Sequence, residues 1–102
     1  INNKRLEEAK KIFNSALSLN PTIKEVHLNL GYIDILTGEF EIADSRLKQA
    51  IALNPDYVLA YENLVLSAKK QNKLEDVKFY LNKILEIAPN HQKAIQLLKQ
   101  LH

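Results

Sequence analysis

The sequence predicts an all-α fold, an α-solenoid built from antiparallel helix pairs. Pro21, Pro55 and Pro89 lie 34 residues apart, and each follows a segment with the same apolar pattern. A fixed period of this size indicates a repeat architecture in which each unit packs only on its neighbours. Apolar residues recur between the prolines at three- and four-residue spacing, and the connections are short. Together these features predict about six amphipathic helices in antiparallel order.

The first expected helix covers residues 4–19. Its apolar stripe includes Leu6, Phe13 and Leu17, while Lys and Glu residues occupy the opposite face. The helix should end before Pro21, because proline disfavours helical backbone at the residue that precedes it. The helix that would pair with this one is missing, so we expect an uncovered apolar face at this end of the array.

The second expected helix covers residues 23–37. Thr22 is its predicted N-cap, and Glu25, three residues later, completes a capping box. Gly38 follows the helix and supplies the left-handed conformation that helix C-termini favour.

The same scheme repeats along the rest of the chain. Asp56 and Asn90 follow their prolines as Thr22 follows its own, so each turn offers an N-cap side chain. Asn72 takes the place of Gly38, and Asn is the next-best residue for the left-handed conformation. The four further helices expected from this pattern cover residues 40–53, 57–71, 74–87 and 91–101.

Composition limits the functions open to this chain. Its 102 residues fit one domain, and the formal net charge of +2 is too small to favour nucleic acid or an anionic membrane as the partner. The chain has no Cys, which excludes disulfides and thiolate sites but leaves the cellular compartment open. No apolar run reaches the length of a membrane span. Because the sequence starts at Ile1 and contains no Met, we expect it to be a fragment of a longer chain.

No catalytic, metal or cofactor site is visible in the sequence. His27, His91 and His102 do not share the three- or four-residue spacing of a helical metal pair. The serines have no His within a helical turn, and two glycines cannot form a phosphate-binding loop. We therefore expect no catalytic residues, no metal and no cofactor, and a chain that is not an enzyme.

Residues 24–57 resemble the tetratricopeptide repeat (TPR). The residues that carry the resemblance are Leu30, Gly31, Gly38, Phe40, Ala43, Leu47, Ala50, Ile51 and Pro55. Small residues such as Gly31 allow two antiparallel helices to approach closely, and large residues fill the space beside the crossing. Residues 58–91 repeat the pattern more loosely. Their larger residues at the small positions are Val65, Val77 and Ile84.

The resemblance covers the whole chain as one array, residues 1–102. It divides the array into the second helix of a truncated repeat, two full repeats and a terminal helix, at residues 3–21, 22–55, 56–89 and 90–102. The truncated first unit suggests an alternative function, which is self-association through the uncovered first helix.

TPR units stack into a right-handed superhelix whose concave groove is lined by the first helix of each unit, and the resemblance implies the same here. The groove residues that it implies are Glu25, Asn29, Tyr32, Leu59, Glu62, Asn63, Leu66, Lys70, Lys93 and Leu97. Further lining residues are Ile35, Leu36, Lys69, Gln96 and Gln100. Asn29 and Asn63 are again 34 residues apart, and their carboxamides can pair with the backbone of an extended peptide. The resemblance therefore implies a scaffold that binds a protein or peptide ligand.

Two other functions stay open at this point. The repeats can serve as structural spacer or self-association units, or as the docking part of a larger enzyme whose catalytic domain lies outside these residues. Some TPR relatives clamp a C-terminal carboxylate with Lys, Asn and Arg side chains, and Asn63 and Lys93 match two of those positions. Leu28, Tyr32 and Leu97 stand at the other positions, so we expect no such clamp.

Three features are interpreted as structural. Asp34 stands where the family has a buried aromatic residue, and we expect its carboxylate to reach solvent or a helix cap, because an unpaired buried charge is costly. His27 occupies an aromatic position between paired helices and is expected to be a packed core ring. Lys69, Lys70 and Lys73 are interpreted as a solvated helix end, with an acidic partner as the alternative.

Overall fold

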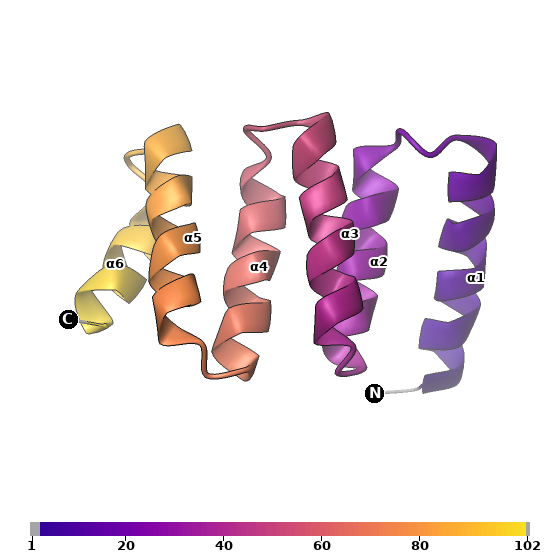
Figure 1. Ribbon diagram of the computed structural model, residues 1–102, viewed down its shortest axis with the longest axis horizontal. Coiled ribbons are helices and arrows are strands. Elements are labelled where there is room, and N and C mark those ends of the chain that lie inside the picture. Colours follow the sequence, from indigo (N-terminus) through magenta and orange to yellow (C-terminus); the bar gives the residue numbers. More distant parts are fainter. Residues whose placement is uncertain (1–2, 102) are drawn as a thin grey trace.

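A computed structural model describes residues 3–101, and within this range the chain forms six α-helices joined by short turns (Figure 1). They are α1 (Asn3–Leu19), α2 (Lys24–Leu36), α3 (Phe40–Leu53), α4 (Val58–Lys70), α5 (Leu74–Ile87) and α6 (Gln92–Gln100). The prediction of an all-α helical repeat is confirmed. Each helix begins and ends within one residue of the range expected from the sequence.

The helices lie side by side in a row, with α1 at one end and α6 at the other (Figure 1). Consecutive helices run antiparallel, as their short connections require. The array measures 41 × 27 × 19 Å along its principal axes. Besides its neighbours in sequence, α2 also packs on α4, so the first helices of the two full units share one side of the row.

The apolar core consists of two clusters joined by two tyrosines. The buried members of the first cluster, among α2, α3 and α4, are Ile35, Ala43, Leu47, Ala50, Tyr57, Ala60 and Leu64. Those of the second, among α4, α5 and α6, are Val65, Ala68, Val77, Leu81, Ile84 and Ala94. Tyr61 and Tyr80 pack against both clusters, with their ring centroids 6.3 Å apart. The core is therefore continuous along the row.

Gly31 permits the close crossing of α2 and α3, as the sequence predicts. A Cβ atom at this position would lie 2.8 Å from Cγ of Leu47, which is closer than packed side chains approach one another. Ala43, also at the crossing, is fully buried. Val65 occupies the corresponding position in the next unit and is packed in the second cluster.

The turn before α2 is capped differently from the prediction. The N-cap position is Ile23, which makes no side-chain capping hydrogen bond, so the predicted capping box of Thr22 and Glu25 is not formed. Instead, the side-chain oxygen of Asn20 accepts a hydrogen bond from the backbone N–H of Thr22 at 3.0 Å. This Asx turn places the polar side chain before the proline and not after it. The turn before α4 repeats the arrangement.

The C-terminal ends of α2 and α4 match the prediction. Gly38 and Asn72 have φ angles of 80° and 58°, in the left-handed region. The residue after each of them donates its backbone N–H back to the helix, to the carbonyl oxygens of Asp34 and Ala68 at 2.7 and 2.9 Å. Both helices therefore end in the same hydrogen-bonded C-terminal cap, whose left-handed residue is Gly or Asn.

Asp34 differs most from the prediction. Its side chain is fully buried and does not reach solvent. Arg46 of α3 donates from Nε to Oδ2 at 3.2 Å, and Lys10 of α1 places Nζ 3.2 Å from Oδ1, an ion contact whose geometry is not that of a hydrogen bond. The prediction was wrong because it treated Asp34 as unpaired, whereas cations from two other helices meet at this carboxylate.

Ser67 is a second buried polar residue and links α3 to α4. Its hydroxyl donates a hydrogen bond to Oδ1 of Asp44 at 2.8 Å. The side-chain amide of Gln71 donates to the hydroxyl and carbonyl oxygens of Ser67 at 3.1 and 3.2 Å. The serine is therefore hydrogen-bonded on both sides within the packed helix pair.

His27 is a buried ring, as the sequence predicts. Its Nε2 lies 2.8 Å from the carbonyl oxygen of Pro21, and since a carbonyl only accepts, Nε2 carries the proton. Nδ1 is buried without a hydrogen-bond partner in the described structure. The ring thus fixes α2 to the turn that precedes it.

Among the described side chains of α1, none is fully buried. Leu6, Phe13 and Leu17, which were expected to form the uncovered face, are half-buried. The large apolar side chains that α1 exposes are Ile12 and Leu19, at 68% and 90%. An exposed apolar surface is therefore present on α1, but on different residues from those expected.

Candidate binding groove

The predicted groove residues come from α2, α4 and α6, and most of their side chains are accessible. Tyr32 and Leu59 are 44% and 54% exposed. Asn29 and Lys70 are also exposed, and Asn63 is half-buried. Neither carboxamide makes a side-chain hydrogen bond within the described part of the chain. Both Asn side chains are therefore free to bind a ligand.

The start of α2 carries charges that are already paired. Lys24 lies 3.4 Å from the carboxylate of Glu25, and its ammonium lies 5.6 Å from the centre of the Tyr57 ring. A backbone hydrogen bond, followed by the Lys24 contact, lowers the pKa of Glu25. Burial raises the pKa of Tyr57. The start of α2 is therefore polar, and the charges of Lys24 and Glu25 offset each other.

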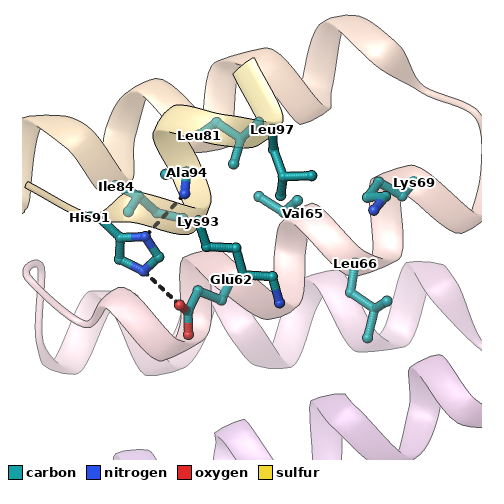
Figure 2. Close-up of a pocket in the computed structure, with 10 residues that line it drawn as sticks. All are labelled: Glu62, Val65, Leu66, Lys69, Leu81, Ile84, His91, Lys93, Ala94 and Leu97. Atoms are coloured by element: carbon teal, nitrogen blue, oxygen red, sulfur yellow. Dashed lines mark hydrogen bonds and ion pairs between the residues drawn. The ribbon is translucent and has the colours of Figure 1, made fainter. Parts of the chain in front are cut away.

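A cavity of about 90 Å³ lies where α4, α5 and α6 meet (Figure 2). Its lining residues are Glu62, Val65, Leu66, Lys69, Leu81, Ile84, His91, Lys93, Ala94 and Leu97. The buried floor is apolar and consists of Val65, Leu81, Ile84 and Ala94. The backbones of α2 and α4 pack directly, whereas no Cα atom of α6 lies within 8 Å of one in α4. The larger distance between α4 and α6 leaves space for the cavity.

Five of the predicted groove residues line this cavity: Glu62, Leu66, Lys69, Lys93 and Leu97. The predicted groove residues that lie elsewhere are Glu25, Asn29, Tyr32, Ile35, Leu36, Leu59, Asn63, Lys70, Gln96 and Gln100. The prediction omitted the α5 residues of the floor, because it took groove residues only from the first helix of each unit. A signal was present, since Ile84 is one of the large residues at a position where the family has a small one.

His91 connects the start of α6 to α4. Its Nδ1 accepts a hydrogen bond from the backbone N–H of Ala94 at 3.1 Å, which makes His91 the N-cap of α6. Nε2 therefore carries the ring proton, and this N–H donates a hydrogen bond to Oε1 of Glu62 at 2.8 Å (Figure 2). The sequence predicted Asn90 as the cap and gave His91 no role.

Two lysines border the cavity from opposite helices. Lys69 comes from α4 and Lys93 from α6, and both are exposed (Figure 2). Neither ammonium group has an ion-pair or hydrogen-bond partner among the residues that the structure describes. The one acidic residue of the lining is Glu62, which accepts from His91. The cavity thus combines an apolar floor with a rim of net positive charge.

Two further features are absent from residues 3–101. None of the helices there has the length and apolarity needed to cross a membrane. The same residues contain no group of three or more His, Asp or Glu side chains placed to hold a metal ion.

Comparison with known sequences identifies the repeat. The family model described as "Tetratricopeptide repeat" matches residues 1–23, 24–57 and 58–91. The chain is also 28% identical over 100 residues to Protein O-mannosyl-transferase Tmtc3 of Drosophila melanogaster. That match covers 94% of this chain but 11% of the fly protein, so the chain spans only a small part of that relative.

Solved structures share the fold. The first TPR of Spaghetti (RPAP3) bound to the HSP90 peptide SRMEEVD has a TM-score of 0.83 and 24% identity, over 97% of this chain and 80% of that one. The first TPR domain of human RPAP3 has a TM-score of 0.84 and 24% identity, over 97% and 78%. YrrB, a TPR protein with an unusual peptide-binding site, has a TM-score of 0.84 and 21% identity, over 94% and 50%. At these identities the likeness establishes the helical repeat fold.

Proposed function

This chain belongs to the tetratricopeptide repeat family, and we propose that it is a protein-interaction scaffold that binds an extended segment of a partner along its groove. The observation that carries the proposal is the pair Asn29 and Asn63. Both carboxamides lack partners within the described chain, and they occupy the same position on α2 and α4, two helices that pack on each other. Each offers a donor and an acceptor to a peptide backbone.

The apolar side chains beside these amides add contact area. Tyr32 and Leu59 are both about half exposed, so a bound segment can cover them. Burial of apolar surface supplies most of the affinity in such contacts, while the amides fix the direction of the peptide. The groove therefore suits a ligand with apolar anchors.

Two of the solved relatives are described with peptides. The Spaghetti domain is bound to an HSP90 peptide, and YrrB has an unusual peptide-binding site. We expect this chain likewise to bind a peptide, but without a clamp for a terminal carboxylate. Leu28 packs against the first core cluster and Leu97 lines the apolar cavity, so neither position supplies a charge.

Selection of a random peptide library displayed on phage tests the proposal. Selected peptides should bind the wild-type chain, and the Asn29→Ala/Asn63→Ala variant should bind them more weakly by about 1–3 kcal/mol. The Asn14→Ala/Asn82→Ala variant is the matched control, because both residues are exposed on α1 and α5, outside the groove. Equal affinity of the two double variants would exclude the groove as the binding surface.

A second candidate function is self-association through α1. It is favoured by the exposure of Ile12 and Leu19 on one terminal helix. Light scattering over a range of concentrations checks it. If the chain self-associates through α1, the Ile12→Ser/Leu19→Ser variant should be monomeric where the wild type is not. A wild type that is monomeric throughout contradicts this function.

We propose no catalytic role for these residues. The similarity to a protein named as an O-mannosyl-transferase favours a third candidate, in which the repeats are the docking part of a larger enzyme. The full-length sequence of the parent protein tests this candidate, since it must then contain a separate catalytic domain.

A further inference from the structure

From the two hydrogen bonds of the His91 ring we infer that the start of α6 is a pH-sensitive switch. The neutral ring caps α6 and also binds α4, whereas the protonated ring binds α4 alone. Acidification therefore loosens the first turn of α6, which forms one wall of the cavity. The inference goes beyond the proposed function and does not depend on it, because it concerns a conformational change of this chain by itself.

The neutral ring makes both contacts in only one of its two tautomers. Nδ1 lies 3.1 Å from the backbone nitrogen of Ala94, and Nε2 lies 2.8 Å from Oε1 of Glu62 (Figure 2). The amide N–H needs an acceptor and the carboxylate needs a donor, so the tautomer with its proton on Nε2 serves both partners. Glu62 thus selects the tautomer that caps the helix.

Protonation of His91 acts on the two contacts in opposite directions. The second proton occupies Nδ1, which then faces the N–H of Ala94 as a donor and can no longer accept from it. The contact between Nε2 and Glu62 becomes an ion pair and strengthens. The imidazolium also lies beside the positive N-terminal end of α6, which repels it. The charged ring therefore keeps its contact with Glu62 and loses its contact with the helix.

Among the residues that line the cavity with His91, none can replace the lost cap. The charged ones are Glu62 and Lys69 of α4 and Lys93 of α6, and α5 contributes only apolar side chains. A lysine ammonium only donates hydrogen bonds, so neither lysine can accept from a backbone N–H. The Glu62 carboxylate is already bound to the ring.

α6 is sensitive to its cap because it is short. It has nine residues, and the N–H groups of its first turn have no partners within the helix. α2, α3, α4 and α5 have no side-chain capping hydrogen bond, whereas α6 has one, from His91. The first turn carries Lys93 and Ala94, which line the cavity together with His91. Since histidine is the side chain that ordinarily changes charge between about pH 5 and 8, mild acid is the signal.

Nuclear magnetic resonance of the isotope-labelled chain tests the switch. In neutral solution Nδ1 of His91 should resonate as an unprotonated ring nitrogen. As the ring titrates between about pH 8 and 5, the amides of Ala94 and Ile95 should lose about three- to ten-fold of their protection against hydrogen exchange, as expected for a lost N-cap. Protection factors are corrected for the direct effect of pH on exchange. The amides of Leu64 and Val65, in the middle of α4, should keep their protection.

Three variants separate the cap from the charge. His91→Asn keeps a good N-cap that does not titrate, so α6 should stay protected over the whole pH range. His91→Ala has no cap, so α6 should be weakly protected at every pH. Glu62→Gln still accepts from Nε2 but carries no charge. Its transition should therefore move to lower pH, because no carboxylate stabilises the imidazolium.

Each contrary result overturns the inference. One is protection of α6 that stays constant while the His91 ring titrates, and another is a neutral ring with its proton on Nδ1. A loss of protection that persists in His91→Asn would assign the effect to a different group, such as His27. A transition of Glu62→Gln at unchanged or higher pH would show that the carboxylate does not hold the charged ring. None of these measurements uses a ligand, so their failure leaves the proposed function standing.

Discussion

The two full repeats carry different residues at the corresponding positions of their helix crossings. In the first, Gly31 faces Leu47, and no larger residue fits between them. In the second, Val65 takes the place of Gly31 and Leu81 that of Leu47. Larger residues hold two helices further apart, and both Val65 and Leu81 line the cavity beside α6. The 34-residue period thus specifies the fold, while the side-chain volume at one position of the crossing differs between the two units.

The same two units also differ in the charge of their cores. Asp34 of the first unit is buried with Arg46, whereas Ala68 and Tyr80 occupy these positions in the second. Ala68 is packed in an apolar cluster, and the Tyr80 ring lies against both clusters. One backbone arrangement therefore accepts either a paired charge or an apolar contact at the same place, provided that the pair is complete.

Breaking the ion pair should have the largest effect on stability. Arg46→Met leaves a fully buried Asp34 with only the ion contact to Lys10, and we expect a loss of about 3 kcal/mol in the free energy of unfolding. Asp34→Ala/Arg46→Met, which makes the first unit as apolar as the second, should stay within about 1 kcal/mol of the wild type. Urea denaturation followed by circular dichroism measures both, and a double variant as unstable as the single one would refute the comparison.

The crossing of the first unit should tolerate less volume than that of the second. Gly31→Ala places a Cβ against the buried side chain of Leu47, and we expect a loss of about 2 kcal/mol. In Gly31→Ala/Leu47→Ala the clash is removed, so the double variant should lose less than the sum of the two single changes. Thermal unfolding of the four proteins measures the coupling. Simple additivity would mean that the two residues do not limit each other.

Ser67 provides a smaller test, because the corresponding residue of the first unit is the apolar Ile33. Ser67→Ala removes the hydroxyl and its hydrogen bonds with Asp44 and Gln71, and we expect a loss of about 1 kcal/mol in the free energy of unfolding. Asp44 is only half-buried, so its carboxylate can turn to water. The denaturant midpoint of Ser67→Ala is compared with that of Ser45→Ala, a control variant at an exposed position of α3. Equal midpoints would show that the Ser67 hydrogen bonds make no net contribution to stability.

The smallest expected effect concerns acid stability. The pKa of Glu25 is lowered from about 4.5 by a backbone hydrogen bond and by Lys24, so the ionised carboxylate stabilises the fold. That contribution is complete above the unfolded pKa and is lost as pH falls through the lower folded pKa. Glu25→Gln should therefore flatten the loss of stability just below pH 4.5, and added salt should reduce the difference.

The residue at the corresponding position of the second unit is Leu59, which does not titrate. Leu59→Gln should leave the pH dependence of the free energy of unfolding unchanged. Matching profiles for Glu25→Gln and the wild type would show that the lowered pKa of Glu25 has no measurable effect on stability.

Most of the fold could be predicted from local signals. The prolines restrict the backbone where they stand, Gly38 and Asn72 permit the left-handed angles that end a helix, and the apolar stripe identifies the inward face of each helix. These effects depend on neighbouring residues in the sequence, so the expected helices agree with the structure to within one residue.

The features that the sequence did not predict depend on residues far apart in the sequence. The partners of Asp34 lie on α1 and α3, and residue type alone does not show that their side chains reach one carboxylate. At the start of α6, Asn90 is the better capping residue by type, but the turn places His91 at the cap, where Glu62 of α4 orients its ring. The cavity depends on the spacing of α4 and α6, which the repeat pattern does not encode.

The Asp34 carboxylate also joins two helices whose backbones lie apart. No Cα atom of α1 lies within 8 Å of one in α3, yet Lys10 of α1 and Arg46 of α3 meet at this one side chain of α2. A repeat array ordinarily frays from its ends, one helix at a time, because each unit holds only its neighbours. Here α1 cannot separate from α2 without removing Lys10 from the Asp34 carboxylate, which then has only Arg46 as its partner. Amide hydrogen exchange should therefore report α1, α2 and α3 opening as one cooperative unit.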